Sequence, residues 1–218
     1  MRLGTFYRSE ILKHFQIQAT KEYVLDVGSY DGYWISNQKA QKKYALDLEV
    51  NRIYDNVNYL QASALEIPFK SNHFDQVFAF DVLEHIEEGQ EKKFLSELLR
   101  VCKKDGEIIV TTPSNLIAMF PRFMTNYISL KWGHAKCNGY SKAQLRDILS
   151  SFSSIEYKIL DNNTPNYRLL YLILRPLWSI FQSLMKVLVA KIARTDFNNR
   201  IGDEGFYLIK IIKRHNNE

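Results

Sequence analysis

Cysteine is scarce in this 218-residue sequence, which has only Cys102 and Cys137, without the spacing of a disulfide framework or a metal-binding motif. The scarcity argues against a small secreted fold held together by disulfides and against a zinc finger. The N-terminal segment contains Arg2 and Arg8 but lacks the apolar core of a signal peptide. We therefore expect the protein in a reducing cytoplasm.

Long uncharged apolar runs are also missing. Residues 169–193 form the most apolar stretch, but a membrane-spanning helix needs about 18 or more consecutive apolar residues. Four residues interrupt the stretch: Arg175, Pro176, Lys186 and Lys191. We expect residues 169–193 to cover the core as a lid, or to contact a membrane surface or a lipid-like substrate, without crossing a bilayer.

Acidic residues are depleted toward the C-terminus. The 29 Lys and Arg exceed the 24 Asp and Glu by five. Residues 1–164 contain 20 of each, whereas residues 165–218 contain 9 basic and 4 acidic residues. Such a basic region can face solvent, nucleic acid or an anionic membrane, and the charge alone does not distinguish these.

The chain does contain enough apolar material for one sizeable core, with 46% hydrophobic and 24% charged residues. Its length corresponds to about one and a half ordinary domains. We expect residues 1–218 to form a single domain, with residues 163–204 as an added helical element. Seven apolar or β-branched runs alternate with helical segments: 23–27, 43–48, 57–61, 76–80, 107–111, 154–160 and 206–212. This alternation predicts an α/β fold with a parallel sheet.

Three helices are expected from the pattern. Residues 87–106 carry an apolar stripe, and Lys103, Lys104 and Gly106 are expected to end that helix. Residues 141–149 begin at Ser141, a favourable N-cap. A third helix is expected from Leu177, with a broad apolar face opposite a narrow polar stripe. The apolar face consists of Leu177, Phe181, Leu184, Leu188 and Ile192; the polar stripe consists of Ser179, Gln182, Ser183 and Lys186.

A glycine-containing turn follows the first expected strand, in the sequence VLDVGSYDGYW. Gly28 and Gly32 would let the backbone approach a ligand closely, and a following helix would offer free N–H groups. Asp47 stands after the second strand, 21 residues beyond Asp26, where a carboxylate can accept hydrogen bonds from ribose hydroxyls. These features together predict a nucleoside-cofactor site, although each glycine could equally serve only the turn.

Four segments in this order resemble the motifs of class I S-adenosylmethionine-dependent methyltransferases, particularly the small-molecule enzymes called type 11. The segments are VLDVGSYDG, ALDLE, ASALEIPFKSNHFDQVFAFDVLEHI and LLRVCKKDGEIIVTTPS, and a later stretch, WGHAKCNGYSKAQLRDIL, is similar to a further family segment. The resemblance covers about residues 20–160. It implies a Rossmann-like sheet of seven strands, mostly parallel with an antiparallel last strand, and S-adenosylmethionine as cofactor.

The resemblance also implies roles for individual residues. It places the methionine end and the ribose at Asp26, Gly28 and Gly32, with Asp47 on the ribose hydroxyls. The cofactor site would also include Ser29, Tyr30 and Leu48. It places the adenine at Ser63 and Ala64, and the reaction side at Phe80 and Asp81. Tyr30 replaces a family glycine, so it would narrow the pocket or face the sulfonium cation. Ser63 replaces a family aspartate, which would lower the affinity for the cofactor.

The sequence DVLEH, residues 81–85, carries a second pattern. On a helix, Asp81, Glu84 and His85 would share one face. This resembles the metal motif of ubiquinone-biosynthesis O-methyltransferases and small-RNA 2′-O-methyltransferases, with His134 as a later ligand. Alternatively, Asp81 is an N-cap and Glu84 its capping-box partner. His85 and His134 are also candidate general bases.

These features imply a methyltransferase that acts on a small or lipid-linked acceptor, with oxygen as the favoured atom. Residues 169–193 would then contact the inner face of a membrane peripherally. A divalent metal is an optional addition, because a sulfonium methyl group is already activated. Three alternatives stay open: a non-catalytic membrane- or partner-binding protein on the same fold, an RNA methyltransferase and a nicotinamide-dependent dehydrogenase. Tyr30 and the lack of a Tyr-xxx-Lys motif oppose the dehydrogenase, and nucleic acid is not an expected partner because no dense Arg/Lys patch appears.

Overall fold

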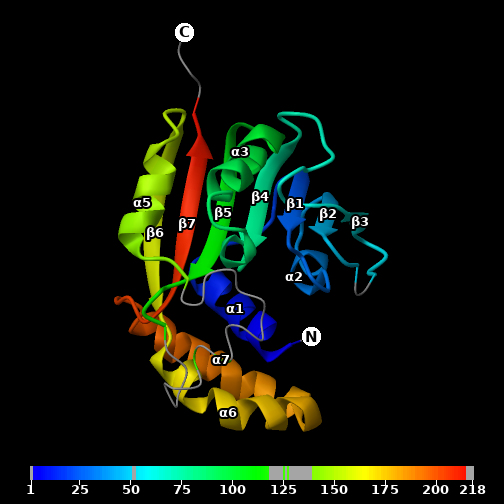
Figure 1. The fold of residues 1–218 in the computed structure, drawn as a ribbon. Coiled ribbons are helices and arrows are strands. Elements are labelled where there is room, and N and C mark those ends of the chain that lie inside the picture. The colour runs from blue at the N-terminus through cyan, green and yellow to red at the C-terminus, as the bar shows by residue number, and fades with distance from the viewer. Residues whose placement is uncertain (1, 51–52, 118–124, 126, 128–138, 215–218) are drawn as a thin grey trace.

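The computed structural model describes residues 2–50, 53–117, 125, 127 and 139–214. Its centre is a seven-stranded sheet of order β3-β2-β1-β4-β5-β7-β6 (Figure 1). The strands are β1 (Tyr23–Val27), β2 (Lys42–Asp47), β3 (Asn58–Gln61), β4 (Phe74–Phe80), β5 (Cys102–Pro113), β6 (Ile155–Asn163) and β7 (Gly205–Lys213). All seven coincide with the expected runs, although β5 is longer at both ends.

Strands β1 to β5 are parallel to one another, whereas β7 is antiparallel to both β5 and β6. This confirms the expected Rossmann-like sheet with an antiparallel last strand. The chain leaves β1 toward β2 and β3 on one side, and then returns to β4 and β5 on the other. The gap between the carboxyl ends of β1 and β4 is therefore a topological switch point, where ligands bind in open α/β sheets.

Two apolar layers cover the sheet. Helices α3 (Glu91–Val101) and α5 (Lys142–Ser150) pack on one face, and the expected stripe of α3 is buried there: Phe94, Leu95, Leu98, Leu99 and Val101. The short helix α2 (Tyr33–Ser36) and the end of α1 cover the other face through Leu12, Trp34 and Ile35. Ser141 caps α5 in a capping box with Gln144, as its position predicted.

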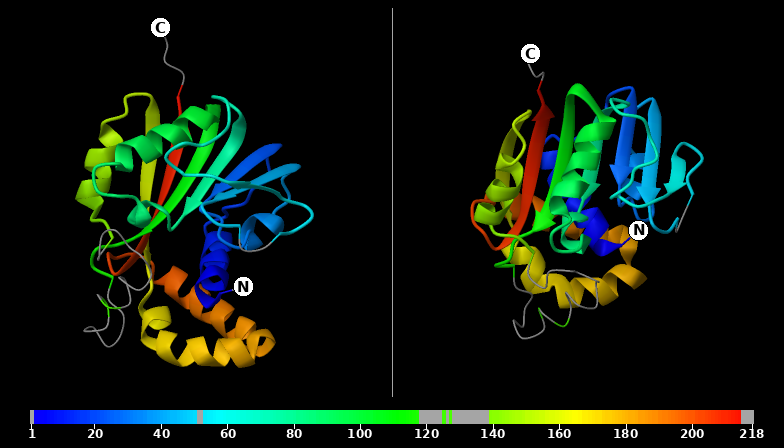
Figure 2. Two further views of the ribbon diagram at one scale, coloured as in Figure 1. Left: turned by 45° about the vertical axis from the view of Figure 1, so that its right-hand side comes forward. Right: turned by 45° about the horizontal axis from the view of Figure 1, so that its top comes forward.

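Three helices form a separate cluster beyond the carboxyl ends of the parallel strands: α1 (Leu3–His14), α6 (Pro165–Ile180) and α7 (Gln182–Asn198). Figures 1 and 2 show α6 and α7 lying side by side under these strand ends, with α1 between them and the sheet. The ring of Phe6 packs against Trp178, with centroids 5.2 Å apart. We call α1, α6 and α7 the cap. No helix in the described part of the chain is long and apolar enough to cross a membrane.

The predicted end of one helix and the predicted start of another were wrong. Helix α3 ends at Val101, before Lys103, because Cys102 already pairs with Phe74 as the start of β5. The helix expected from Leu177 is the end of α6, which begins at Pro165 and contains Pro176. Tyr171, Leu174 and Trp178 are buried on both sides of this proline, so tertiary packing outweighs its disruption of the helix.

The break between the two cap helices lies at Phe181, which ends α6 and precedes α7. The predicted broad apolar face is mostly exposed and does not pack on the core. Its member Ile192 is buried, whereas Leu177, Phe181, Leu184 and Leu188 are exposed. The buried side of α7 consists instead of Met185, Val189, Ile192 and Ala193, with Asp196.

Candidate functional site

The loop after β1 turns sharply at the switch point. Gly28 and Gly32 both have positive φ, of 69° and 63°. A Cβ atom on Gly28 would lie 2.3 Å from the Val82 Cγ2 atom, and one on Gly32 would lie 2.3 Å from the Tyr59 hydroxyl oxygen. Both positions therefore require glycine for conformation and for space. Between them, Tyr30 adopts φ 53°, the conformation that a glycine would take without strain.

The ring of Tyr30 is partly covered by a cation from the cap. The Arg2 guanidinium carbon lies 3.7 Å from the ring centroid. The ring therefore already faces one cation of the protein, and its predicted contact with the sulfonium stays a prediction. A sulfonium would have to share or replace that contact.

Asp47 connects the ends of β1 and β2. Its Oδ2 atom accepts a hydrogen bond from the Tyr30 N–H at 2.7 Å, and Oδ1 accepts one from the Glu49 N–H at 3.3 Å. The Gly28 N–H donates to the Leu46 carbonyl at 2.7 Å. Asp47 therefore holds the glycine loop in place and presents a carboxylate at the carboxyl end of β2, where the sequence predicted a partner for ribose hydroxyls.

Asp26 is nearly fully buried beneath this loop, with 3% of its surface exposed. Burial raises the pKa of its carboxyl group, Arg8 lowers it in part, and the nearby acids Asp47 and Asp31 raise it, so that the pKa is about 8. A buried carboxyl group with such a pKa gains from a cationic ligand, because the cation would stabilise its charged form.

The loop after β3 lies next to Asp47. The Ala62 N–H donates to the Asp47 carbonyl oxygen, and the Ser63 hydroxyl accepts from the Leu65 N–H. Further along, Arg100 on α3 donates to the carbonyl oxygens of Ile67 and Phe69 and holds the loop against the core. Leu48 exposes 67% of its surface at this edge. An exposed leucine beside a carboxylate that can bind ribose could pack against the flat apolar face of a nucleoside's base.

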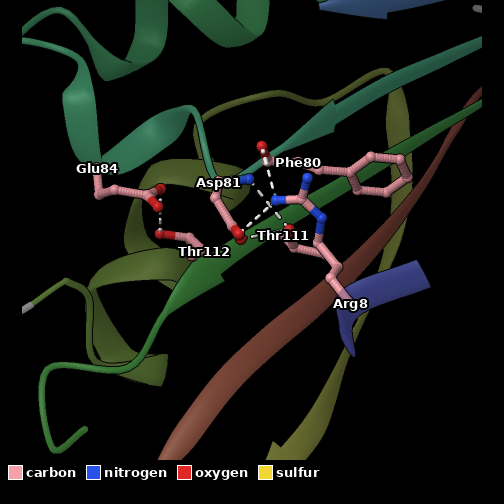
Figure 3. Close-up of polar contacts among 6 residues, drawn as sticks. All are labelled: Arg8, Phe80, Asp81, Glu84, Thr111 and Thr112. Carbon is pink, nitrogen blue, oxygen red and sulfur yellow. Dashed lines mark hydrogen bonds and ion pairs between the residues drawn. The ribbon is translucent and has the colours of Figure 1, made fainter. Parts of the chain in front are cut away.

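Asp81 begins the turn after β4 with φ 54°, a strained conformation for a non-glycine residue. Its N–H donates to the Thr111 carbonyl oxygen, and the Thr111 hydroxyl donates to Oδ1 at 2.7 Å. Arg8 on α1 donates to Oδ2 at 2.5 Å, and its guanidinium carbon lies 5.4 Å from the Phe80 ring centroid (Figure 3). The predicted reaction side is thus closed on one side by the cap.

The predicted metal cluster does not form on one helix face. Residues 83–85 are a single 3-10 turn, η1 (Leu83–His85), with Asp81 before it. Asp81 pairs with Arg8, Glu84 is buried beside the Thr112 hydroxyl, and His85 is exposed. Burial and the charge of Asp81 raise the pKa of Glu84. No group of three His, Cys, Asp or Glu able to hold a metal occurs among the described residues.

The alternative capping prediction for residues 81–84 was also wrong. Val82 occupies the N-cap of η1, and no side chain caps the turn. The Asp81 carboxylate is instead used by Arg8 and Thr111, since its left-handed backbone points it away from the turn. His134 lies outside the described residues, so its predicted roles stay predictions.

Arg2, Arg8 and Asp31 belong to the site but were not identified as site residues from the sequence. Asp31 is buried and accepts a hydrogen bond from the Tyr33 N–H at the start of α2. A signal for α1 exists: Leu3, Phe6, Tyr7 and Ile11 have helical spacing, and all four are buried. A helix that covers the strand ends would have drawn attention to Arg8 within it and to Arg2 at its N-cap.

Residues 20–110 match the protein family described as "Methyltransferase domain". This segment contains β1 to β4, α3 and most of β5, with the glycine loop and Asp47. The match covers 91 of the 218 residues, and the fold is that of solved SAM-dependent methyltransferases. A relative from Methanocaldococcus jannaschii, itself uncharacterized, is 34% identical over 106 residues, which cover 47% of this chain and 45% of that protein.

Solved methyltransferase structures share the fold at low identity. Phosphoethanolamine N-methyltransferase 2 of Haemonchus contortus, in complex with S-adenosyl-L-methionine, is 20% identical with a TM-score of 0.61, over 94% of this chain and 51% of that one. A possible histamine N-methyltransferase of Thermotoga maritima is 16% identical, with a TM-score of 0.62, over 97% and 91% of the chains. A SAM-dependent methyltransferase of Archaeoglobus fulgidus is 15% identical, with a TM-score of 0.62, over 94% and 93%. The chain spans about half the length of the M. jannaschii and H. contortus proteins.

Proposed function

We propose that this protein transfers a methyl group from S-adenosylmethionine to a small acceptor. The arrangement of Gly28, Gly32 and Asp47 at the switch point carries the proposal. An added Cβ atom at either glycine would lie 2.3 Å from a neighbouring side chain, and the carboxylate stands at the end of the adjacent strand. The family match over residues 20–110 and the neighbours crystallised with S-adenosylmethionine or S-adenosylhomocysteine support the same cofactor.

In this proposal, each part of the site holds one part of the cofactor. Asp47 accepts hydrogen bonds from the ribose hydroxyls, and Leu48 packs against the adenine beside Ser63 and Ala64. The buried Asp26 lies under the loop that holds the methionine end, whose ammonium group would stabilise the ionised carboxylate. The exchange of a family aspartate for Ser63 removes one acceptor, so the adenine would bind mainly by contact with apolar surface.

S-adenosylmethionine supplies a methyl group that is already activated for displacement. The protein then contributes chiefly by holding acceptor and methyl group in line and by excluding water. Phe80 and Asp81 border this space, and Arg8 fixes the Asp81 carboxylate from the cap. Since Arg8 already neutralises Asp81, this pair would orient the acceptor more readily than remove its proton. The assignment of His85 or His134 as general base stays a prediction.

We further propose a lipid-linked or apolar acceptor, methylated at oxygen, with the protein at the inner face of a membrane in contact through residues 169–193. The exposed apolar side chains of α6 and α7 support an apolar acceptor. Nitrogen is the alternative acceptor atom, because two of the structural neighbours are N-methyltransferases by name.

The test is transfer of a labelled methyl group. The purified chain is incubated with methyl-tritiated S-adenosylmethionine and either a lipid extract or the water-soluble metabolites of a cell, and labelled products are identified by mass spectrometry. We expect label in the lipid extract, on oxygen, and none with the Asp47→Ala variant. Label only among soluble amines would refute the finer proposal. No transfer to either fraction, with the variant indistinguishable from the native protein, would favour the non-catalytic alternative.

A further inference from the structure

The cap presents an apolar surface to solvent. Six large side chains on the outer side of α6 and α7 are each more than half exposed: Leu169, Ile173, Ile180, Phe181, Leu184 and Val187. We call this surface the hairpin face. Soluble proteins rarely expose so many neighbouring apolar groups unless the surface meets a partner or a membrane. The opposite sides of the same helices are buried against α1, so the hairpin face is not needed for packing of the cap.

The charged residues around the hairpin face indicate what kind of partner it binds. The charged side chains of α6 and α7 that reach solvent are Arg175, Lys186, Lys191 and Arg194, and all are basic. The acid of α7, Asp196, is fully buried, where it accepts hydrogen bonds from the Tyr7 hydroxyl and from the N–H groups of Asn166 and Tyr167 at the start of α6. Arg168 is buried and pairs with Glu204. Apolar residues flanked only by cations are the pattern of a helix that lies in the interface of an anionic membrane.

We propose that the hairpin face docks on an anionic lipid bilayer, with its apolar side chains among the acyl chains and the basic residues at the phosphate groups. The proposal rests on the proposed function and deepens it by naming the partner surface. A second copy of the chain fits less well, because a symmetric contact through this face would bring the same four cations together.

Docking in this orientation brings the site close to the membrane. The start of α6 is joined to α1 by the Tyr7 and Tyr167 rings, which stack with centroids 3.9 Å apart. The residue after Tyr7 is Arg8, which contacts Asp81. Only the thickness of the cap, about 10 Å per helix layer, therefore separates the lipid surface from the predicted reaction side (Figures 1 and 2). An acceptor anchored in the bilayer would need a headgroup or linker that spans these two helix layers, about 20 Å, to reach the site.

The experiment is vesicle flotation of the full chain with phosphatidylcholine vesicles, with and without phosphatidylglycerol. We expect binding to the vesicles that contain phosphatidylglycerol, and binding at least fivefold weaker to phosphatidylcholine alone, because attraction to anionic lipid adds to apolar burial. The double variant Phe181→Ser/Leu184→Ser should bind roughly tenfold more weakly, since binding scales with the apolar area buried in the interface. These side chains are exposed, so the melting temperature should stay near that of the native protein.

Ile201→Ser is the matched control. Ile201 exposes 85% of its surface but follows α7, about 25 Å along the helix from its first turn. It should bind vesicles like the native protein. The absence of vesicle binding, an equal loss in the control variant, or a dimer in light scattering that the double variant abolishes would each overturn the proposal. Titration with S-adenosylhomocysteine without vesicles separates the two proposals: binding of this ligand without vesicle binding contradicts only the membrane docking, and the reverse contradicts only the methyltransferase function.

Discussion

The guanidinium of Arg8 donates to the carboxylate of Asp81 at 2.5 Å and joins residues 73 positions apart in the sequence. Arg8 lies on α1 and Asp81 at the end of β4, so this pair ties the cap to the sheet beside the predicted reaction side. The family-matched segment begins at residue 20 and therefore contains Asp81 but not Arg8. The cap thus contributes to the site from outside the matched domain.

The first prediction concerns this pair. Side chains of Arg8 and Asp81 are 20% and 41% exposed, so solvent screens their attraction in part. We expect Arg8→Met and Asp81→Asn to show a coupling of about 1 kcal/mol in the free energy of unfolding, measured by a double-mutant cycle in urea. Additive effects of the two substitutions would show that the ion pair does not hold the cap on the sheet.

The second prediction concerns pH. Burial raises the pKa of Asp26 from 3.8 to about 8, so between these values the folded protein binds a proton that the unfolded chain releases. Its contribution to stability therefore falls as pH rises through this window. Asp26→Asn removes this pH dependence. The free energy of unfolding of the variant minus that of the native protein should therefore rise between pH 5 and pH 8, by on the order of 1 kcal/mol per pH unit.

Urea unfolding of both proteins at several pH values measures this difference. A difference that does not change with pH would show that Asp26 ionises normally in the folded state. The same variant should also lose affinity for S-adenosylhomocysteine, because a neutral amide cannot stabilise the ammonium group of the methionine end.

The third prediction concerns Gly28. Gly28→Ala would place a methyl group against Val82 in a backbone with φ 69°, and we expect it to cost about 1–3 kcal/mol of unfolding free energy. Combined with Val82→Ala, the cost should be smaller than the sum of the single substitutions, because the clash is relieved. Gly89→Ala is the control: φ is 89° there, but nothing lies within 4 Å of the added Cβ, so only the backbone cost remains. Equal losses at Gly28 and Gly89 would argue against close packing at the loop.

The fourth prediction concerns Tyr30. A backbone φ of 53° destabilises a non-glycine residue by about 1–2 kcal/mol. The cation–π contact with Arg2 stabilises the folded state by about 0.5–1 kcal/mol. Tyr30→Gly should therefore leave the free energy of unfolding within about 1 kcal/mol of the native value. Tyr30→Val, with a branched side chain in the same conformation, should be clearly less stable in thermal denaturation. A stable valine variant would show that the loop relaxes to a different conformation.

The sequence was sufficient to predict the sheet and the glycine loop, but it was not sufficient to predict how the cap is built. The strands were predictable because each is a short apolar run bounded by turns, and Gly28, Gly32 and Asp47 lie where these strands end. The turn at residues 81–85 was not, because its conformation depends on Thr111 from β5 and Arg8 from α1. The break at Phe181 depends on how Trp178 and Met185 pack against α1, which no local pattern encodes.

Calorimetric titration with S-adenosylhomocysteine, of the native protein and of Asp47→Ala, tests the central claim most directly. The account predicts binding by the native protein, and binding at least tenfold weaker in the variant, because one carboxylate holds both the ribose and the glycine loop. Circular dichroism would confirm that the variant is folded. The absence of binding by the native protein, or equal binding by both proteins, would contradict the assignment of the cofactor site to the carboxyl ends of β1 and β2.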